Sequence, residues 1–298
     1  ETFDLALPHG ITLSCRAAGT PGAPLLVFLH GFPEGAFVWD ELLTHFAPRY
    51  RCIAPNLRGY ERSSSPAEVE AYRPKHLVAD IAALIAAQGG RAAALVAHDW
   101  GGAVAWALAA LQPQCIARLV IVNSPHPGTF LRELRDNPAQ RAASGYMNFL
   151  CRPDAEALLA ENDFERLWPF FERMGASDPV HPGGGWLTPS VRAQYREVWR
   201  HGLAGGCNYY RASPLRPPAG PDDETLAALE LPASMLTVNV PTHVLWAEAD
   251  IALPPALLDG LDAFVPKLSI TRVPGATHWI VHEQPARVVA EIERALAA

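Results

Sequence analysis

The stretch Ala97-His98-Asp99-Trp100-Gly101-Gly102 decides the fold of this chain. It follows an apolar run at 92–96 and leads into 103–108, whose composition indicates a buried helix. The expected order is therefore strand, sharp turn and helix. Small residues beside such a turn let the backbone pack closely. The residue in the middle of the stretch is Asp99.

An aspartate at this position predicts a particular chemistry. A carboxylate is ionised near neutral pH, so Asp99 needs no base before it attacks an sp3 carbon, displaces a halide or opens a strained ring. The product is an ester on the enzyme, and its hydrolysis requires water activated by a histidine that a second carboxylate orients. The alternative is that Asp99 only caps the following helix, a common role for aspartate.

The overall composition narrows the class of protein. With 298 residues, 49% of them hydrophobic, the chain suffices for one large domain or one domain with an insertion. A net charge of −7 and a pI near 5.9 argue against nucleic acid or an anionic membrane as a partner. No apolar run approaches the roughly 20 residues that span a bilayer. We therefore expect no membrane partner, and a homodimer remains an open expectation.

The cysteines and the first residues bear on the cellular compartment. Five cysteines lack metal-ligand spacing and predict reduced thiols. No leader is visible at Glu1, although one already removed would leave no trace. These features favour a cytoplasmic protein. No cluster of histidines or carboxylates has ligand spacing, so we expect no metal and no cofactor.

The remaining apolar runs predict a layered core. Strands expected to be buried alternate with helical stripes such as 75–87, which implies a mostly parallel sheet with helices on both faces. The final helix is expected at 284–297. The first strands, within 2–16, alternate in polarity and are expected at an edge. The other expected strands lie at 24–29, 52–55, 119–122, 242–246 and 268–273.

The alternation of expected strands and helices ends after residue 128. From 129 to 214 the sequence predicts only helical segments, at 139–151, 154–173 and 189–201. An insertion of this kind at the carboxyl ends of parallel strands is placed to cover a ligand site. We therefore expect a core of residues 1–128 and 215–298 with a helical cap, or lid, of residues 129–214.

Two further loops carry candidates for the histidine and its carboxylate. Asp250 follows the strand at 242–246, and His278 follows the strand at 268–273. His282 and Glu248 are the rival base and acid. The loop before the cap offers Asn123 and no carboxylate, which favours Asp250.

Together these motifs resemble the α/β-hydrolase superfamily, in its branch of epoxide hydrolases and haloalkane dehalogenases. The resemblance rests on His30-Gly31-Phe32-Pro33, on residues 98–102, on the chain order Asp99, Asp250, His278, and on a cap after the sixth strand. It covers essentially the whole chain and implies an eight-stranded sheet. Ala97 departs from the glycine usual at that place.

The resemblance also implies roles for individual residues. Asp99 would be the nucleophile, His278 would activate water and Asp250 would orient His278. Backbone N–H groups of Phe32 and Trp100 would form the oxyanion hole. Substrate contacts are implied for His30, Phe32 and Trp100.

Tyrosines in the expected cap indicate whether the substrate is an epoxide or a compound with a carbon–halogen bond. Asn208-Tyr209-Tyr210-Arg211 and Ser144-Gly145-Tyr146-Met147 resemble the epoxide hydrolase segments whose tyrosines hydrogen-bond the ring oxygen. A tyrosine is protonated at neutral pH and can act as that acid. The alternative is that Tyr146 and Tyr210 only pack the cap; Tyr209 is expected to face away from the site.

Two rival functions remain open. A haloalkane or haloacid dehalogenase would use the same triad, but Phe32 stands where a halide-binding asparagine is often found, and Trp100 where fluoroacetate dehalogenases carry an arginine. Trp168 or Trp186 could donate to a halide, although packing is the simpler role. The more distant rival is a non-catalytic protein that binds or senses a small molecule. The sequence favours hydrolysis of a small hydrophobic epoxide to a vicinal diol.

Overall fold

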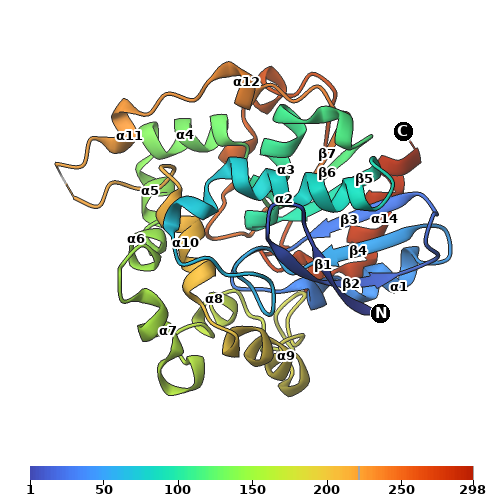
Figure 1. Cartoon of the computed structure of the whole chain (residues 1–298). Helices are drawn as coiled ribbons and strands as arrows, with labels where there is room; N and C mark the ends of the chain where they lie inside the picture. The colour runs from blue at the N-terminus through green and yellow to red at the C-terminus, as the bar shows by residue number, and fades with distance from the viewer. Residues whose placement is uncertain (221, 298) are drawn as a thin grey trace.

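The computed structural model describes residues 1–220 and 222–297 and contains one eight-stranded sheet (Figure 1). The strand order is β1-β2-β4-β3-β5-β6-β7-β8; β1 and β2 run antiparallel to their neighbours and the other strands run parallel. The α/β fold is as expected, but β2 pairs with both β1 and β4, so only β1 is an edge strand at that end. The strands are β1 Thr2–Ala6, β2 Thr12–Ala18, β3 Leu25–Leu29, β4 Arg51–Pro55, β5 Ala92–His98, β6 Leu119–Val122, β7 Thr242–Ala247 and β8 Leu268–Val273.

Helices cover both faces of the sheet. On one face, α1 (Asp40–Phe46) and α14 (Pro285–Ala297) pack side by side; on the other, α2 (Pro74–Ala87) lies against α3 (Asp99–Leu111). Every residue of β3, β4, β6 and β7 is buried, because parallel strands between two helical layers meet apolar side chains on both sides. The short helix α13 (Ile280–Glu283) precedes α14.

The cap after β6 is helical, but its helices are shorter and more numerous than the sequence predicted. The segment expected at 139–151 divides near Gly145, and the one expected at 154–173 divides where Asn162 and Asp163 adopt left-handed φ values of 49° and 56°. A helix begins at Pro127, slightly before the predicted cap. The cap helices are α4 Pro127–Asp136, α5 Pro138–Ala143, α6 Tyr146–Leu150, α7 Ala155–Phe164, α8 Pro169–Glu172, α9 Pro189–Arg200 and α10 Ala204–Ala212.

Several helical turns were not predicted at all. Helices α4 and α10 were missed, and so were the short helices α11 (Thr225–Ala228) and α12 (Ala233–Leu236), which lie between the cap and β7. Helix α10 contains two glycines, which lower intrinsic helix propensity by about 1 kcal/mol each relative to alanine. Its packing against the core overrides that preference. The 3-10 helices are Ala36–Trp39, Val69–Tyr72, Pro113–Cys115, Pro255–Leu258 and Leu261–Ala263.

Two glycines form a close contact between cap and core. A methyl group on Gly205 of α10 would lie 2.3 Å from the Cα of Gly59, in the loop after β4, and a methyl group on Gly59 would lie 2.7 Å from the Cα of Gly205. Such distances leave no space for any side chain. Gly59 also has a φ of 85°, which favours glycine. The backbone of α10 therefore lies directly on the core.

No helix among the described residues is both long and apolar enough to cross a bilayer.

Candidate active site

Asp99 lies at a strained turn between β5 and α3. Its φ of 49° is in the left-handed region, unusual for a residue with a side chain. The Ser124 hydroxyl donates a hydrogen bond of 2.7 Å to its carbonyl oxygen. Methyl groups on Gly101 or Gly102 would lie 2.5 Å from the Leu29 carbonyl oxygen or 2.2 Å from the Ser124 Cβ. The small residues beside Asp99 are therefore required by close packing.

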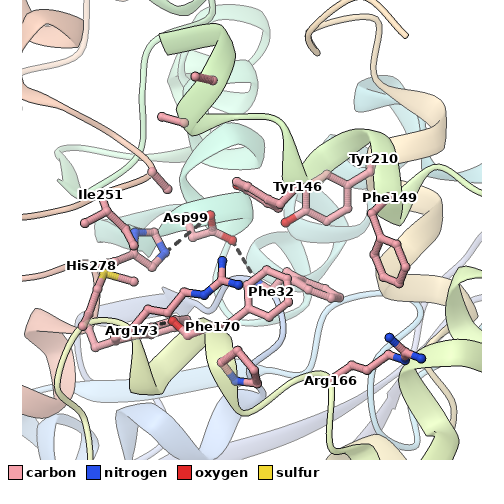
Figure 2. Close-up of a pocket in the computed structure, with 16 residues that line it drawn as sticks. Phe32, Asp99, Tyr146, Phe149, Arg166, Phe170, Arg173, Tyr210, Ile251 and His278 are labelled. Carbon is pink, nitrogen blue, oxygen red and sulfur yellow. Dashed lines mark hydrogen bonds and ion pairs between the residues drawn. The ribbon is translucent and has the colours of Figure 1, made fainter. Parts of the chain in front are cut away.

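The Asp99 carboxylate has a different partner at each oxygen. The backbone N–H of Phe32 donates a hydrogen bond of 2.8 Å to Oδ1. Oδ2 lies 3.7 Å from Nε2 of His278, a charge contact longer than a hydrogen bond (Figure 2). Trp100 is the second residue of α3, where backbone N–H groups have no partner within the helix. The Phe32 N–H is thus a backbone donor to the carboxylate, and the Trp100 N–H at the start of α3 is the second donor that the sequence predicts.

Asp250 holds His278 from the other side. Nδ1 of His278 donates a hydrogen bond of 2.6 Å to Oδ2 of Asp250. Backbone N–H groups of Ala252 and Leu253 donate to Oδ1 at 2.8 and 3.0 Å. Asp250 is therefore fixed in place, and it fixes the orientation of the imidazole.

Asn123 is a partner of Asp250 that the sequence analysis noted only for lacking a carboxylate. Its side-chain amide donates 2.9 Å to Oδ2 of Asp250 and accepts a 2.7 Å hydrogen bond from the Ala247 backbone N–H. Like Asp99, Asn123 has a positive φ, of 39°. Asn123 follows β6, which pairs with β7. This position was the one feature of the sequence that could have predicted a contact with the loop after β7, where Asp250 lies.

The charges of these groups depend on one another. Burial disfavours the imidazolium of His278, but the charge and hydrogen bond of Asp250, with the charges of Asp99 and Glu34, outweigh it and raise the pKa of His278 to about 9. Burial alone would raise the pKa of Asp250; the charge and hydrogen bonds of His278 and Asn123 reverse this and lower it. The resting site therefore holds a protonated His278 between two carboxylates.

Two cap tyrosines face Asp99 across a cavity of about 550 Å³ (Figure 2). Tyr146 begins α6 and Tyr210 lies in α10, and their ring centres are 6.1 Å apart. Tyr210 meets the rings of Trp100 and Phe32 edge-on, at 5.0 and 5.3 Å. Burial, followed by neighbouring negative charge, raises the pKa of both tyrosines, so both hydroxyls stay protonated at neutral pH. The cavity thus combines a carboxylate, an imidazole and two phenolic donors.

His30, expected to contact substrate, lies elsewhere. Its ring is fully buried, and it lines neither cavity that contains Asp99. Its Nε2 accepts a hydrogen bond of 3.0 Å from the Leu57 N–H, while Nδ1 lies 2.9 Å from the Gly31 carbonyl oxygen. Both nitrogens are occupied by backbone, so His30 joins the loops after β3 and β4 and is unavailable to a substrate.

The rival residues also have other partners. Glu248 pairs with Arg272 at 3.5 Å, and His282 lies 3.2 Å from Glu34 and 2.8 Å from the Tyr195 hydroxyl. Tyr209 donates its hydroxyl to the Arg58 carbonyl oxygen at 3.0 Å, away from Asp99. In the same way, Trp168 packs against Trp199 and two arginines, and Trp186 stacks on His282.

Glu34 is a buried carboxylate that the sequence analysis overlooked. Tyr195 donates to its Oε1 at 3.0 Å, and His98 Nδ1 lies 3.0 Å from its Oε2. Burial opposes its charge, but hydrogen bonds and charges from His282 and His98 hold the pKa of Glu34 well below its usual range. His98 Nε2 in turn lies 2.9 Å from the His278 carbonyl oxygen. Glu34 follows Pro33 directly, but its partners are 64 or more residues distant in the chain, so no local signal predicted the cluster.

Comparisons with known proteins cover both core and cap. Residues 24–285 match the family model described as the α/β-hydrolase fold. The chain is 34% identical over 284 residues to the AB hydrolase superfamily protein YfhM of Bacillus subtilis, spanning 94% of this chain and 92% of that protein. It is 32% identical over 280 residues to epoxide hydrolase 4 of Mus musculus, spanning 93% and 74%. The crystal structure of Bacillus megaterium epoxide hydrolase with an inhibitor superposes with a TM-score of 0.89 at 29% identity, over 99% of this chain and 100% of the other.

Proposed function

This chain belongs to the α/β-hydrolase family and is a hydrolase, and from that premise we propose that it converts an epoxide to a vicinal diol through an ester on Asp99. One observation carries the proposal: Tyr146 and Tyr210 line the same cavity as Asp99 and His278. An epoxide leaves as an alkoxide, which needs a proton donor, whereas a halide does not. Two protonated phenols beside a carboxylate nucleophile meet that need.

The first step opens the ring. With Oδ1 held by the Phe32 N–H, Oδ2 of Asp99 attacks a ring carbon and forms the ester bond, while the carbon–oxygen bond of the epoxide breaks. The electron pair goes to the ring oxygen, which takes a proton from Tyr210 or Tyr146. Hydrogen bonds to a charged group contribute about 1.5–3 kcal/mol each, so each tyrosine is expected to accelerate this step substantially.

The second step hydrolyses the ester. Ester formation removes the charge of Asp99, which contributes to the raised pKa of His278, so the imidazolium loses its proton more readily, and this proton restores the tyrosine hydroxyl used in the first step. Neutral His278 then takes a proton from water, and the hydroxide attacks the Asp99 carboxyl carbon. Negative charge develops on Oδ1, where the Phe32 and Trp100 N–H groups stabilise it. Collapse of this intermediate breaks its bond to the alkoxide, which takes a proton from His278 and leaves as the diol; the Asp99 carboxyl then gives its proton to His278, and the carboxylate is regenerated.

The walls of the cavity favour a hydrophobic substrate. Phe32, Phe149, Phe170 and Met174 line it together with Trp279. These side chains exclude water from the reacting groups and bind apolar substituents. We therefore propose that the substrate is an epoxide with a hydrophobic substituent.

The test is the intact mass of the His278→Gln variant after incubation with terminal and aryl epoxides and, separately, with haloalkanes and haloacetates. Without the base the ester on Asp99 should persist, as an adduct of the whole epoxide mass. The double variant Asp99→Asn, His278→Gln is the matched control and should form no adduct.

The other outcomes contradict the proposal. An adduct formed from a haloalkane or haloacetate and lighter than it by one hydrogen halide, with none from epoxides, indicates a dehalogenase. No adduct and no turnover with any compound indicates a protein that binds its ligand without reaction.

A further inference from the structure

Asp99 lies where two cavities meet. The first, lined also by Phe170 and Trp279, is the one described above; the second, also about 550 Å³, continues past Trp100 toward Leu253. Asp99, Tyr146 and Tyr210 line both. Because the two carbons of an epoxide carry substituents that point apart, a substrate at Asp99 can place one in each cavity.

The first cavity contains a cation that has no partner among the described residues. Arg173, the residue after α8, lines it together with Arg166. Arg166 pairs with Glu161 at 3.5 Å, whereas within the described chain no carboxylate lies within 4.0 Å of the Arg173 guanidinium and no carbonyl accepts from it. Every other arginine of the cap, residues 129–214, has such a carboxylate or carbonyl partner; these are Arg132, Arg135, Arg141, Arg152, Arg166, Arg192, Arg196, Arg200 and Arg211.

The orientation of Arg173 suits recognition of a ligand. Figure 2 shows its guanidinium directed into the cavity toward the side on which Asp99 lies. Arg173 is an exposed residue whose side chain lines the cavity together with Phe170, Met174 and Trp279. The planar fork of a guanidinium matches a carboxylate with two parallel hydrogen bonds.

The second cavity has a different character. Its lining includes the apolar side chains of Trp100, Val104, Phe130 and Leu253. The arginines that line it have protein partners: Arg73 pairs with Glu70, Arg211 with Glu156, and Arg216 donates to the Ser213 carbonyl oxygen. This cavity is therefore suited to an apolar substituent.

From these contacts we propose that Arg173 binds an anionic substituent of the substrate, a carboxylate in its simplest form, while the apolar substituent on the other epoxide carbon lies against Trp100 and Leu253. An anion that approaches Asp99 is otherwise repelled by the nucleophile, and Arg173 compensates for this repulsion. The proposal rests on the epoxide hydrolase activity proposed above and names its substrate class: epoxides that carry a carboxylate on one side and a hydrophobic group on the other.

The test compares two matched series of substrates. Each oxirane carries a phenyl group on one carbon and, on the other, a chain of one to four methylene groups that ends in a carboxylate or in the neutral primary amide. For Arg173→Gln we expect kcat/KM to fall about 10- to 100-fold with the best carboxylate, mainly through KM, and to change less than about twofold with the amide. Arg173→Lys should recover part of the loss, and high ionic strength should weaken the preference of the unmodified protein.

Arg166→Gln is the matched control, because that arginine lines the same cavity but pairs with Glu161. It should leave the ratio of carboxylate to amide unchanged. Equal losses for both series in Arg173→Gln, or no loss in either, would overturn the proposal.

Failure of the proposed activity is distinguished by a binding measurement. If the unmodified protein turns over no epoxide, calorimetry with 4-phenylbutyrate and 4-phenylbutanamide still tests the anion site. Tighter binding of the carboxylate that disappears in Arg173→Gln supports the site without the activity. Equal binding of the two compounds, or a preference that survives the substitution, overturns it.

Discussion

The substitution Asp99→Asn should convert His278 from an imidazolium to a neutral base near pH 7. An asparagine at this position resembles the esterified aspartate, because both present a neutral carbonyl to His278. The distance of 3.7 Å between Nε2 and Oδ2 sets the size of the effect. Two unit charges at about 4 Å interact by about 4 kcal/mol at an effective dielectric constant of about 20.

This interaction can be expressed as a pKa. Each change of one in a pKa corresponds to about 1.36 kcal/mol, so loss of the Asp99 charge lowers the pKa of His278 by at most about three. From about 9 in the resting protein, it should fall toward about 6. The remaining partner, Asp250, keeps its 2.6 Å hydrogen bond to Nδ1 and continues to oppose the effect of burial.

Nuclear magnetic resonance of ¹⁵N-labelled histidine, recorded between pH 5 and 10, measures this pKa directly. The protein has 11 histidines, and the signals of His278 are identified by their absence from His278→Gln. Tyr146→Phe is the control: it removes no charge and should leave the pKa near 9. In single-turnover experiments, hydrolysis of the ester should follow an apparent pKa well below 9. A His278 pKa that stays near 9 in Asp99→Asn would refute the reasoning, since ester formation would then release no base.

The remaining predictions concern the acids, the buried carboxylate and the cap. Tyr210→Phe and Tyr146→Phe should each slow formation of the ester about 10- to 100-fold, because each removes a hydrogen bond to a developing alkoxide. Quenched-flow mass spectrometry measures the rate of ester formation. An unchanged rate in Tyr210→Phe would contradict the proposed role of Tyr210 as an acid. The folded protein depresses the pKa of Glu34, so the stabilisation by the Glu34 carboxylate is present above about pH 4.5 and is lost as the pH falls through the folded pKa. Glu34→Gln should therefore lower the free energy of unfolding by about 2–4 kcal/mol at pH 7 and weaken the dependence of the urea midpoint on pH below about pH 4.5. Parallel pH profiles for the two proteins would contradict this prediction. Gly205→Ala should lower the free energy of unfolding by about 1–3 kcal/mol through the clash with Gly59 and reduce kcat/KM as α10 shifts; a urea midpoint equal to that of the unmodified protein would contradict the close contact.

The sheet and the position of Asp99 were predictable because each depends on local signals. The strands are short apolar runs, and Asp99 stands among small residues at a strand-to-helix turn. Asp250 and His278 each follow a strand, and the carboxyl ends of neighbouring parallel strands meet at one edge of a sheet. The contact of His278 with both carboxylates follows from that topology.

The features that escaped prediction depend on contacts between distant segments. Glu34 acquires its role from His98, Tyr195 and His282, three residues on three separate elements. The position of Arg173 in the cavity depends on how short cap helices pack, and helix propensity does not encode that packing. The surroundings of His30 were unexpected for the opposite reason: its neighbours in the sequence belong to the site, but its ring is buried and contacts the backbone of Gly31 and Leu57.

The contact between Gly59 and Gly205 restricts how caps can be exchanged among hydrolases of this architecture. A transplanted cap would keep its phenolic donor within reach of the nascent alkoxide only if it brought glycine to the position of Gly205 and the recipient retained Gly59. Any larger residue would lift α10 and withdraw Tyr210 together with it. Chimeras designed on this rule should vary in the compounds they accept while conserving their acid chemistry.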